Sequence, residues 1–171
     1  MEDFLRNWFN VPMEGEGREN LELSDSNWNK VYDFIVEKND EELLFSDGLL
    51  FRVHTGGKKK PRYNDYSDHG EYQDETFKAV YSFWLKQNDV NAIEFNNHWV
   101  SFTDSVDVIN SDYFGEKGLR GFVIVVRPKK AINIYPFRRV GFDEREVVAP
   151  MDKSTVIEVL SFDKFISKYK K

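Results

Sequence analysis

The chain of 171 residues has a formal net charge of −6, 40% hydrophobic residues and no cysteine. Its length suits one domain, and its 15 Phe, 8 Tyr and 4 Trp supply enough apolar volume for a core, which argues against a disordered chain. The negative charge argues against nucleic-acid binding by phosphate neutralisation, and the lack of cysteine excludes disulfides, thiolate metal sites and cysteine catalysis.

The N-terminal sequence MEDFLRNWFNVPMEGEG is acidic and lacks the basic and then apolar layout of a secretory signal peptide. No apolar run approaches the roughly 20 residues that span a bilayer. These two observations predict a cytoplasmic protein that does not enter a membrane.

Two helices are expected in the first half of the chain. Residues 24–40 and 73–87 both place apolar side chains at helical spacing, and Asp25 or Ser26 is positioned to cap the first helix. Both apolar stripes are expected to face a core. They are formed by Trp28, Val31, Tyr32, Ile35 and Val36 in the first helix and by Phe77, Val80, Tyr81, Trp84 and Leu85 in the second.

The remainder of the chain has the pattern of β-strands, rich in β-branched and aromatic residues between turn signals. Because helices come early and strands late, the sequence predicts an α+β fold. We expect a single domain over residues 1–171, with a helical N-terminal part (1–45) and the sheets in residues 46–171. The predicted strands are 49–54, 98–103, 121–128, 131–135, 145–149 and 155–162.

Three polar features interrupt these apolar strands. They are Arg52, the pair Ser101 and Thr103, and the pair Glu144 and Glu146. Each has an ordinary structural explanation on its own. A strand arginine extends its charged end to water, a Ser-x-Thr pair forms cross-strand hydrogen bonds, and a Glu-x-Glu pair covers a solvated strand face.

Together and in this order, the three features resemble the motifs of the Arg–Ser–Glu class of mono-ADP-ribosyltransferases. That family carries an aromatic residue and an arginine on an early strand and a Ser-Thr-Ser type of motif on a second strand. A Glu-x-Glu motif then leads into an apolar strand that often closes with proline. The matching residues are Phe51-Arg52, Ser101-Phe102-Thr103 and Glu144-Arg145-Glu146 with the run VVAP, and the resemblance covers roughly residues 45–162.

The resemblance implies a sandwich of two roughly perpendicular sheets with flanking helices and with NAD in the cleft between the sheets. Breaking the nicotinamide–ribose bond creates an oxocarbenium-like transition state, which carboxylates beside the sugar stabilise. By resemblance, Glu146 bonds the ribose 2′-hydroxyl and stabilises this charge, while Glu144 orients and deprotonates the acceptor. Residues two apart on an extended strand share a face about 7 Å apart, so one carboxylate is expected to address the sugar and the other the nucleophile.

The resemblance also assigns residues to NAD binding. Arg52 is expected to hold the pyrophosphate or the adenine ribose. Ser101 is expected to orient Glu146, and Thr103 to help form the nicotinamide pocket. Phe142, in a loop at the position of the family's substrate-recognition turn, is expected to stack on the acceptor or the nicotinamide.

The same loop contains Phe137, a second candidate for stacking, and Arg138 and Arg139, which are expected to meet phosphate or an acidic partner surface, or to be merely exposed. Some details depart from the family pattern. Phe102 stands where a Thr is usual in the second motif, and Asp104 follows that motif.

The stretch VHTGG (53–57) loosely resembles the His-Gly-Thr strand of the diphtheria-toxin and poly-ADP-ribose polymerase class, and this second resemblance makes His54 a candidate for binding NAD. The Glu-x-Glu and Ser-x-Thr patterns favour the Arg class. A metal is not expected, because the three histidines, His54, His69 and His98, have no metal-ligand spacing.

The expected function is transfer of ADP-ribose from NAD, the co-substrate, to a side chain of a target protein. Arginine is the favoured acceptor, because the first glutamate of Glu-x-Glu is associated with arginine acceptors in this family. An effector of the kind that phages use to modify host proteins or to counter defence fits the architecture. Two alternatives stay open: an NAD glycohydrolase, with water as acceptor, and a non-enzymatic acidic protein that binds and inhibits a partner.

Overall fold

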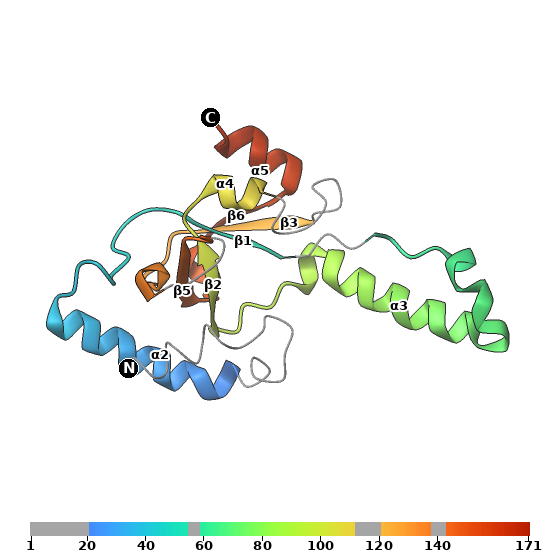
Figure 1. Ribbon diagram of the computed structural model, residues 1–171, viewed down its shortest axis with the longest axis horizontal. Coiled ribbons are helices and arrows are strands. Elements are labelled where there is room, and N and C mark those ends of the chain that lie inside the picture. The colour runs from blue at the N-terminus through green and yellow to red at the C-terminus, as the bar shows by residue number, and fades with distance from the viewer. Residues whose placement is uncertain (1–20, 55–58, 112–120, 138–142) are drawn as a thin grey trace.

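A computed structural model describes residues 21–54, 59–111, 121–137 and 143–171 (Figure 1). Six antiparallel strands form one sheet in the order β4-β5-β2-β1-β3-β6. The strands are β1 (Leu50–Val53), β2 (Trp99–Thr103), β3 (Phe122–Val126), β4 (Ile132–Asn133), β5 (Glu146–Pro150) and β6 (Val156–Ser161). The predicted α+β class is confirmed, and each of the six predicted strands is present, but the described strands form one sheet and not the two sheets expected.

The described helices include three that contact the sheet and one, α3 (Gln73–Asn88), that extends away from it (Figure 1). The α-helices are α2 (Leu21–Lys38), α3 (Gln73–Asn88), α4 (Val106–Asn110) and α5 (Phe162–Tyr169). Short 3₁₀ segments are η1 (Tyr63–Tyr72), η2 (Val90–Ala92), η5 (Tyr135–Phe137) and η6 (Lys153–Thr155). No helix among the described residues is long and apolar enough to cross a membrane.

One face of the sheet is covered by helices at both of its ends. At the β5–β2 end, Trp28 and Ile35 of α2 pack against Trp99 and Val148, and the two tryptophan rings stack with centroids 6.0 Å apart. The predicted apolar stripe of this helix therefore faces a core. At the other end of the sheet, α4 and α5 cover β1 and β3 through a second cluster, formed by Phe51, Ile109, Val123, Val125, Phe162 and Phe165.

The opposite face of the sheet closes on itself. Its core cluster takes Leu50 and Ile124 from one end of the sheet and Phe102 and Val147 from the other. These side chains alternate along their strands with those that face the helices, as the period of two in a strand requires. The sheet is therefore bent about the β1–β2 junction, where a single residue pair, Phe51 and Thr103, joins the two strands.

The stripe of α3 does not behave as predicted. The helix projects from the sheet, and η1 lies at its far end (Figure 1). None of its apolar residues with described side chains is buried, and Leu85 is 44% exposed. The prediction of a core-facing stripe is wrong here, because the apolar side of α3 packs on its own neighbouring chain, at Tyr63 and Tyr66, rather than on the sheet.

The predicted capping role of Asp25 or Ser26 is also wrong. Helix α2 begins at Leu21, so both residues lie inside it. The Asp25 carboxylate instead accepts hydrogen bonds from the backbone N–H of Trp99, at 2.9 Å, and lies 2.6 Å from Nδ1 of His98. This carboxylate fastens α2 to the start of β2.

Candidate active site

The fold brings Arg52, Ser101 and Glu146 together from three neighbouring strands. They lie on β1, β2 and β5, which are adjacent in the sheet although 49 and 45 residues separate them along the chain. A hydrogen bond joins each neighbouring pair: Arg52 to Ser101, and Ser101 to Glu146. Arg52 bonds to the backbone carbonyl of Ser101, whereas Glu146 bonds to its hydroxyl. The strand register places the Arg52 side chain on one face of the sheet and the Ser101 and Glu146 side chains on the other.

The Ser101–Glu146 contact is a diagonal cross-strand pair. In the β2–β5 register, Thr103 lies opposite Glu146 and Ser101 lies opposite Val148, so the side chains of Ser101 and Glu146 share a face of the sheet. The Ser101 hydroxyl donates to Oε1 of the Glu146 carboxylate. Both residues are half-buried, so the serine fixes one carboxylate oxygen while the residue stays partly open to a ligand.

Arg52 joins β1 to β2 at the place where their ladder ends. The only paired residues of these two strands are Phe51 and Thr103. One residue further along β1, Arg52 Nη1 donates to the backbone carbonyl of Ser101 at 2.7 Å. A side chain therefore holds the two strands together where they diverge.

A partly open cleft of about 150 Å³ lies where the strands diverge. It is lined by Arg52, His54, Ile93, Glu94, Asn96, His98, Val100, Ile124 and Met151. A guanidinium with five N–H donors at the wall of such a cleft suits a phosphate or carboxylate. The aliphatic side chains opposite offer a surface for a flat or apolar group.

His54 is one of the residues that line this cleft. Its Nε2 is buried and has no hydrogen-bond partner among the described residues. Burial lowers the pKa of His54, and the nearby charge of Arg52 lowers it further. The ring is therefore neutral near pH 7, and its orphaned nitrogen is a position for a ligand's polar group.

The Glu-x-Glu pair does not adopt the extended geometry expected of it. Strand β5 begins only at Glu146, and Arg145 has a φ of 46°, in the left-handed region. The prediction that Glu144 and Glu146 share a strand face is wrong, because the turn at Arg145 breaks the alternation of side chains. Glu144 is half-buried just before this turn.

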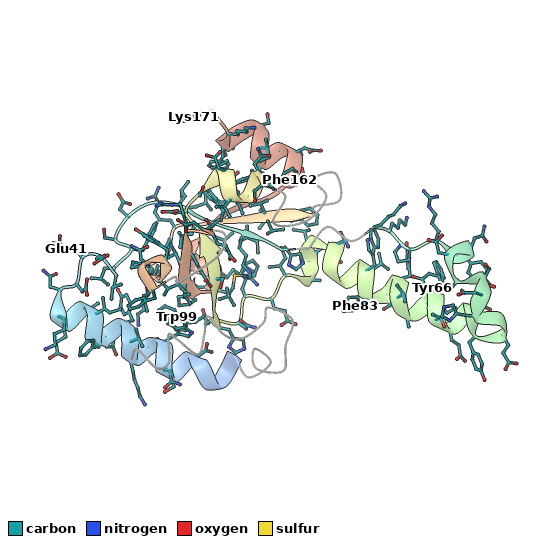
Figure 2. All side chains as sticks on the ribbon, viewed as in Figure 1. Glu41, Tyr66, Phe83, Trp99, Phe162 and Lys171 are labelled. Carbon is teal, nitrogen blue, oxygen red and sulfur yellow. The ribbon has the colours of Figure 1, made fainter. Side chains whose placement is uncertain are left out.

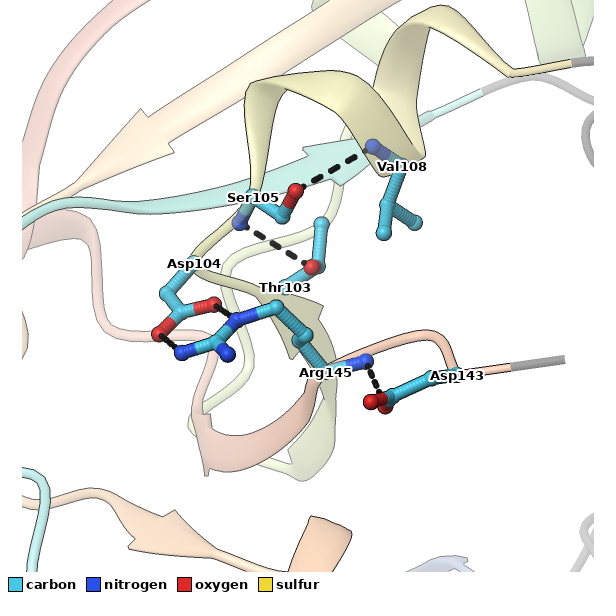
Figure 3. A network of polar contacts seen from close by, with 6 residues as sticks. All are labelled: Thr103, Asp104, Ser105, Val108, Asp143 and Arg145. Carbon is cyan, nitrogen blue, oxygen red and sulfur yellow. Dashed lines mark hydrogen bonds and ion pairs between the residues drawn. The ribbon is translucent and has the colours of Figure 1, made fainter.

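Arg145 itself fastens the turn to the end of β2 (Figure 3). Its Nε and Nη2 donate to the two carboxylate oxygens of Asp104 at 2.6 and 2.8 Å, and its backbone N–H donates to Asp143 at 3.0 Å. The guanidinium also lies 5.2 Å from the centre of the Tyr135 ring. The Asp104 carboxylate raises the pKa of Arg145 still further, so the guanidinium stays charged.

Two of the other expected ligand contacts have structural partners. Thr103 is 4% exposed, and its hydroxyl accepts a hydrogen bond from the Ser105 N–H at 3.1 Å, which shapes the turn into α4 (Figure 3). Phe137 packs against the core cluster under α2. Phe142, Arg138 and Arg139 lie outside the described residues.

The sequence reasoning missed the roles of Asp104, Arg145, Asp25 and His98. The sequence analysis considered Asp104 only as a departure from the family pattern. It considered Arg145 only as the residue between the two glutamates. A signal was available, since an acidic residue ends one strand and a basic residue precedes its neighbour. That arrangement favours a cross-strand ion pair when the strands are adjacent.

No group of three or more His, Asp or Glu side chains in the described part of the chain is arranged to hold a metal ion.

Comparison of the chain with protein-family models, with curated proteins and with solved structures found no match.

Proposed function

We propose that the protein is an NAD-dependent mono-ADP-ribosyltransferase that modifies a side chain, arginine first, of a target protein. The observation that supports it is the hydrogen bond from the Ser101 hydroxyl to the Glu146 carboxylate, with Arg52 on the adjacent strand bonded to the Ser101 backbone carbonyl. All three residues belong to the motifs that resemble those of the Arg–Ser–Glu class. We further propose that the bent sheet corresponds to the two-sheet sandwich of that family, with NAD entering where β1 and β2 diverge.

In the proposed reaction, the bond between the ribose anomeric carbon and the nicotinamide nitrogen breaks, and a bond forms between that carbon and the acceptor nitrogen. Glu146 stabilises the positive charge that develops on the ribose. Ser101 holds the carboxylate in a single orientation, which limits the reorganisation needed in the transition state. Arg52 supplies positive charge for the pyrophosphate at the wall of the cleft.

Glu144 is proposed to take the proton from the acceptor. Because a turn separates it from Glu146, its distance from the sugar is set by the Arg145–Asp104 clamp rather than by the pleat of a strand. Transfer to a protein and hydrolysis of NAD therefore depend on different carboxylates.

The test is incubation of the purified protein with labelled NAD and a bacterial lysate. Wild type is compared with Glu146→Gln and with Glu41→Gln, the same chemical change at an exposed position. We expect a labelled protein band with wild type and Glu41→Gln and none with Glu146→Gln. Calorimetry should find NAD bound to Glu146→Gln with little loss of affinity.

Glu144→Gln separates the two roles. It should leave nicotinamide release to water nearly unchanged and remove most of the labelled band. Nicotinamide release without any band, in wild type as well, would favour an NAD glycohydrolase. If wild type neither binds nor cleaves NAD, the enzyme proposal is refuted and an acidic binding protein becomes the better explanation.

A further inference from the structure

The most prominent part of the molecule outside the candidate site is the arm, residues 59–88, which comprises the segment 59–62, η1 and α3. It extends away from the sheet (Figures 1 and 2), and its helix alone is about 24 Å long at 1.5 Å per residue. None of the residues 59–85 is buried. The arm therefore contributes little to the core of its own domain.

The arm nevertheless has a defined shape, because aromatic rings of η1 and α3 pack against one another along its length. Phe77 contacts Tyr66 and Tyr81, and Tyr81 stacks on Trp84, with centroids 5.4 to 6.2 Å apart. Lys60 of the outgoing segment lies over the rings of Tyr81 and Trp84. A preformed projection binds a partner with less ordering cost than a loose loop.

A second set of apolar groups on the arm faces water. Tyr63, Tyr72 and Phe83 are 46%, 61% and 53% exposed. Ala79 and Phe83 are four residues apart in α3, which places them on one side of the helix. Tyr72 is the last residue of η1, directly before the helix. Aromatic side chains on an accessible face are the residues that contribute most to protein–protein interfaces.

The charge around these tyrosines indicates what the face binds. Residues 63–77, at the far end of the arm, contain Asp65, Asp68, Glu71, Asp74 and Glu75 and no Lys or Arg, whereas the basic residues of the arm flank this stretch at Lys59, Lys60, Arg62, Lys78 and Lys86. Asp74 accepts a hydrogen bond from the Tyr63 hydroxyl at 2.5 Å, so ring and carboxylate are held side by side. Arginine suits such a surface, because its planar guanidinium pairs with carboxylates and also stacks on aromatic rings.

We infer that the arm is the docking surface for the target protein and that the target presents an arginine-rich surface to it. The identity of this partner as the acceptor rests on the proposed function. The arm selects the target at a distance from the cleft, while the cleft and Glu144 act on one arginine of that target. Binding of a basic surface by the arm is a separate property and is measurable without NAD.

The test uses two acceptors of different length, one too small to contact the cleft and the arm together and one long enough to do so. One is agmatine, a small guanidine, and the other is a 20-residue arginine-rich peptide, which spans about 66 Å when extended. The arm variant is Asp65→Asn, Asp68→Asn, Glu71→Gln. The matched control is Asp33→Asn, Glu37→Gln, Glu41→Gln, which removes three exposed carboxylates from the α2 side of the protein instead.

We expect the arm variant to weaken peptide binding, measured by fluorescence anisotropy without NAD, at least about fivefold, as three lost surface ion pairs allow. The KM for the peptide should rise by a similar factor, and that for agmatine should not change. The control should alter neither by more than about twofold. Tyr72→Ala, which leaves the charge unchanged, should also weaken peptide binding.

Equal peptide binding by wild type and arm variant would overturn the inference, as would equal losses in the arm variant and the control. Analytical ultracentrifugation tests whether the arm binds a second copy of the chain instead. If wild type forms dimers and the arm variant does not, the partner is a second copy and the inference of an arginine-rich target is overturned. If wild type cleaves no NAD while anisotropy still finds arm-dependent peptide binding, the proposed function fails and the docking surface stands.

Discussion

If the protein cleaves NAD as proposed, replacing Ser101 with alanine is expected to slow that cleavage about 10- to 30-fold without weakening NAD binding. The change removes the hydroxyl that donates to Oε1 of Glu146. Hydrogen bonds to charged groups contribute about 1.5–3 kcal/mol. Because both residues are half-buried, we take the lower part of this range, about 1.5–2 kcal/mol, which corresponds to the stated loss at ~1.4 kcal/mol per tenfold in rate.

The assay is nicotinamide release at saturating and at limiting NAD, with kcat and KM determined separately. In the proposed reaction Ser101 acts by positioning Glu146, so kcat should fall while KM stays within about twofold. Ser101→Thr keeps a hydroxyl and should recover most of the rate. Ser167→Ala, the same kind of change on the exposed side of α5, should have no effect.

Two results would refute this reasoning. If Ser101→Ala is as fast as wild type while Glu146→Gln is inactive, the hydrogen bond has no role in catalysis. If KM rises and kcat does not change, Ser101 contacts NAD directly and does not act through Glu146.

Three further predictions concern stability and pH. In a double-mutant cycle of Arg145→Ala and Asp104→Ala, urea denaturation should give a coupling of about 0.5–1 kcal/mol, because the arginine is half exposed and such pairs contribute little; additive effects would contradict the clamp. Trp28→Ala should lower the free energy of unfolding by about 3–5 kcal/mol, because the ring is fully buried, whereas Phe83→Ala should change it by less than about 0.5 kcal/mol; similar losses would contradict the assignment of core and arm. The pKa of His54 is lowered from 6.5 in the folded state, so its contribution to stability is complete above pH 6.5 and is lost as the pH falls through the folded-state pKa. Stability should therefore fall more steeply on acidification in wild type than in His54→Gln, and equal slopes would contradict this.

The sheet was predictable from the sequence because its strands have a local signature. Runs such as that of β3, with four consecutive buried residues from Val123 to Val126, are apolar and β-branched, and alternation on β2 separated the face of Trp99 from that of Phe102. Helix α5 was not predicted, although Phe162, Phe165, Ile166 and Tyr169 have helical spacing. The predicted strand 155–162 included Phe162, which is the first residue of this helix.

The wrong predictions concern contacts whose partner the local sequence pattern does not specify. An apolar stripe indicates that one side of a helix is packed, but it does not say against which segment. Helix α3 packs on the segment beside it instead of on the sheet. Likewise, Glu-x-Glu implies a shared face only if the chain is extended, and no signal in the residue type of Arg145 predicts its positive φ. A clamp to Asp104, 41 residues away, holds that conformation, and such contacts depend on strand order.

The candidate site lies where the pairing of β1 and β2 ends, after Phe51 and Thr103. This position explains why an arginine occupies an apolar strand. A leucine at position 52 would extend the apolar face that Leu50 and Ile124 form, and nothing would then mark the point where β1 leaves β2. Arg52 instead bonds to the Ser101 carbonyl beyond the last ladder pair. The same guanidinium closes the fork structurally and lines the cleft beside it. Glu146 is coupled to this point through the Ser101 side chain, so the strand junction and the carboxylate are fixed relative to each other before any ligand binds.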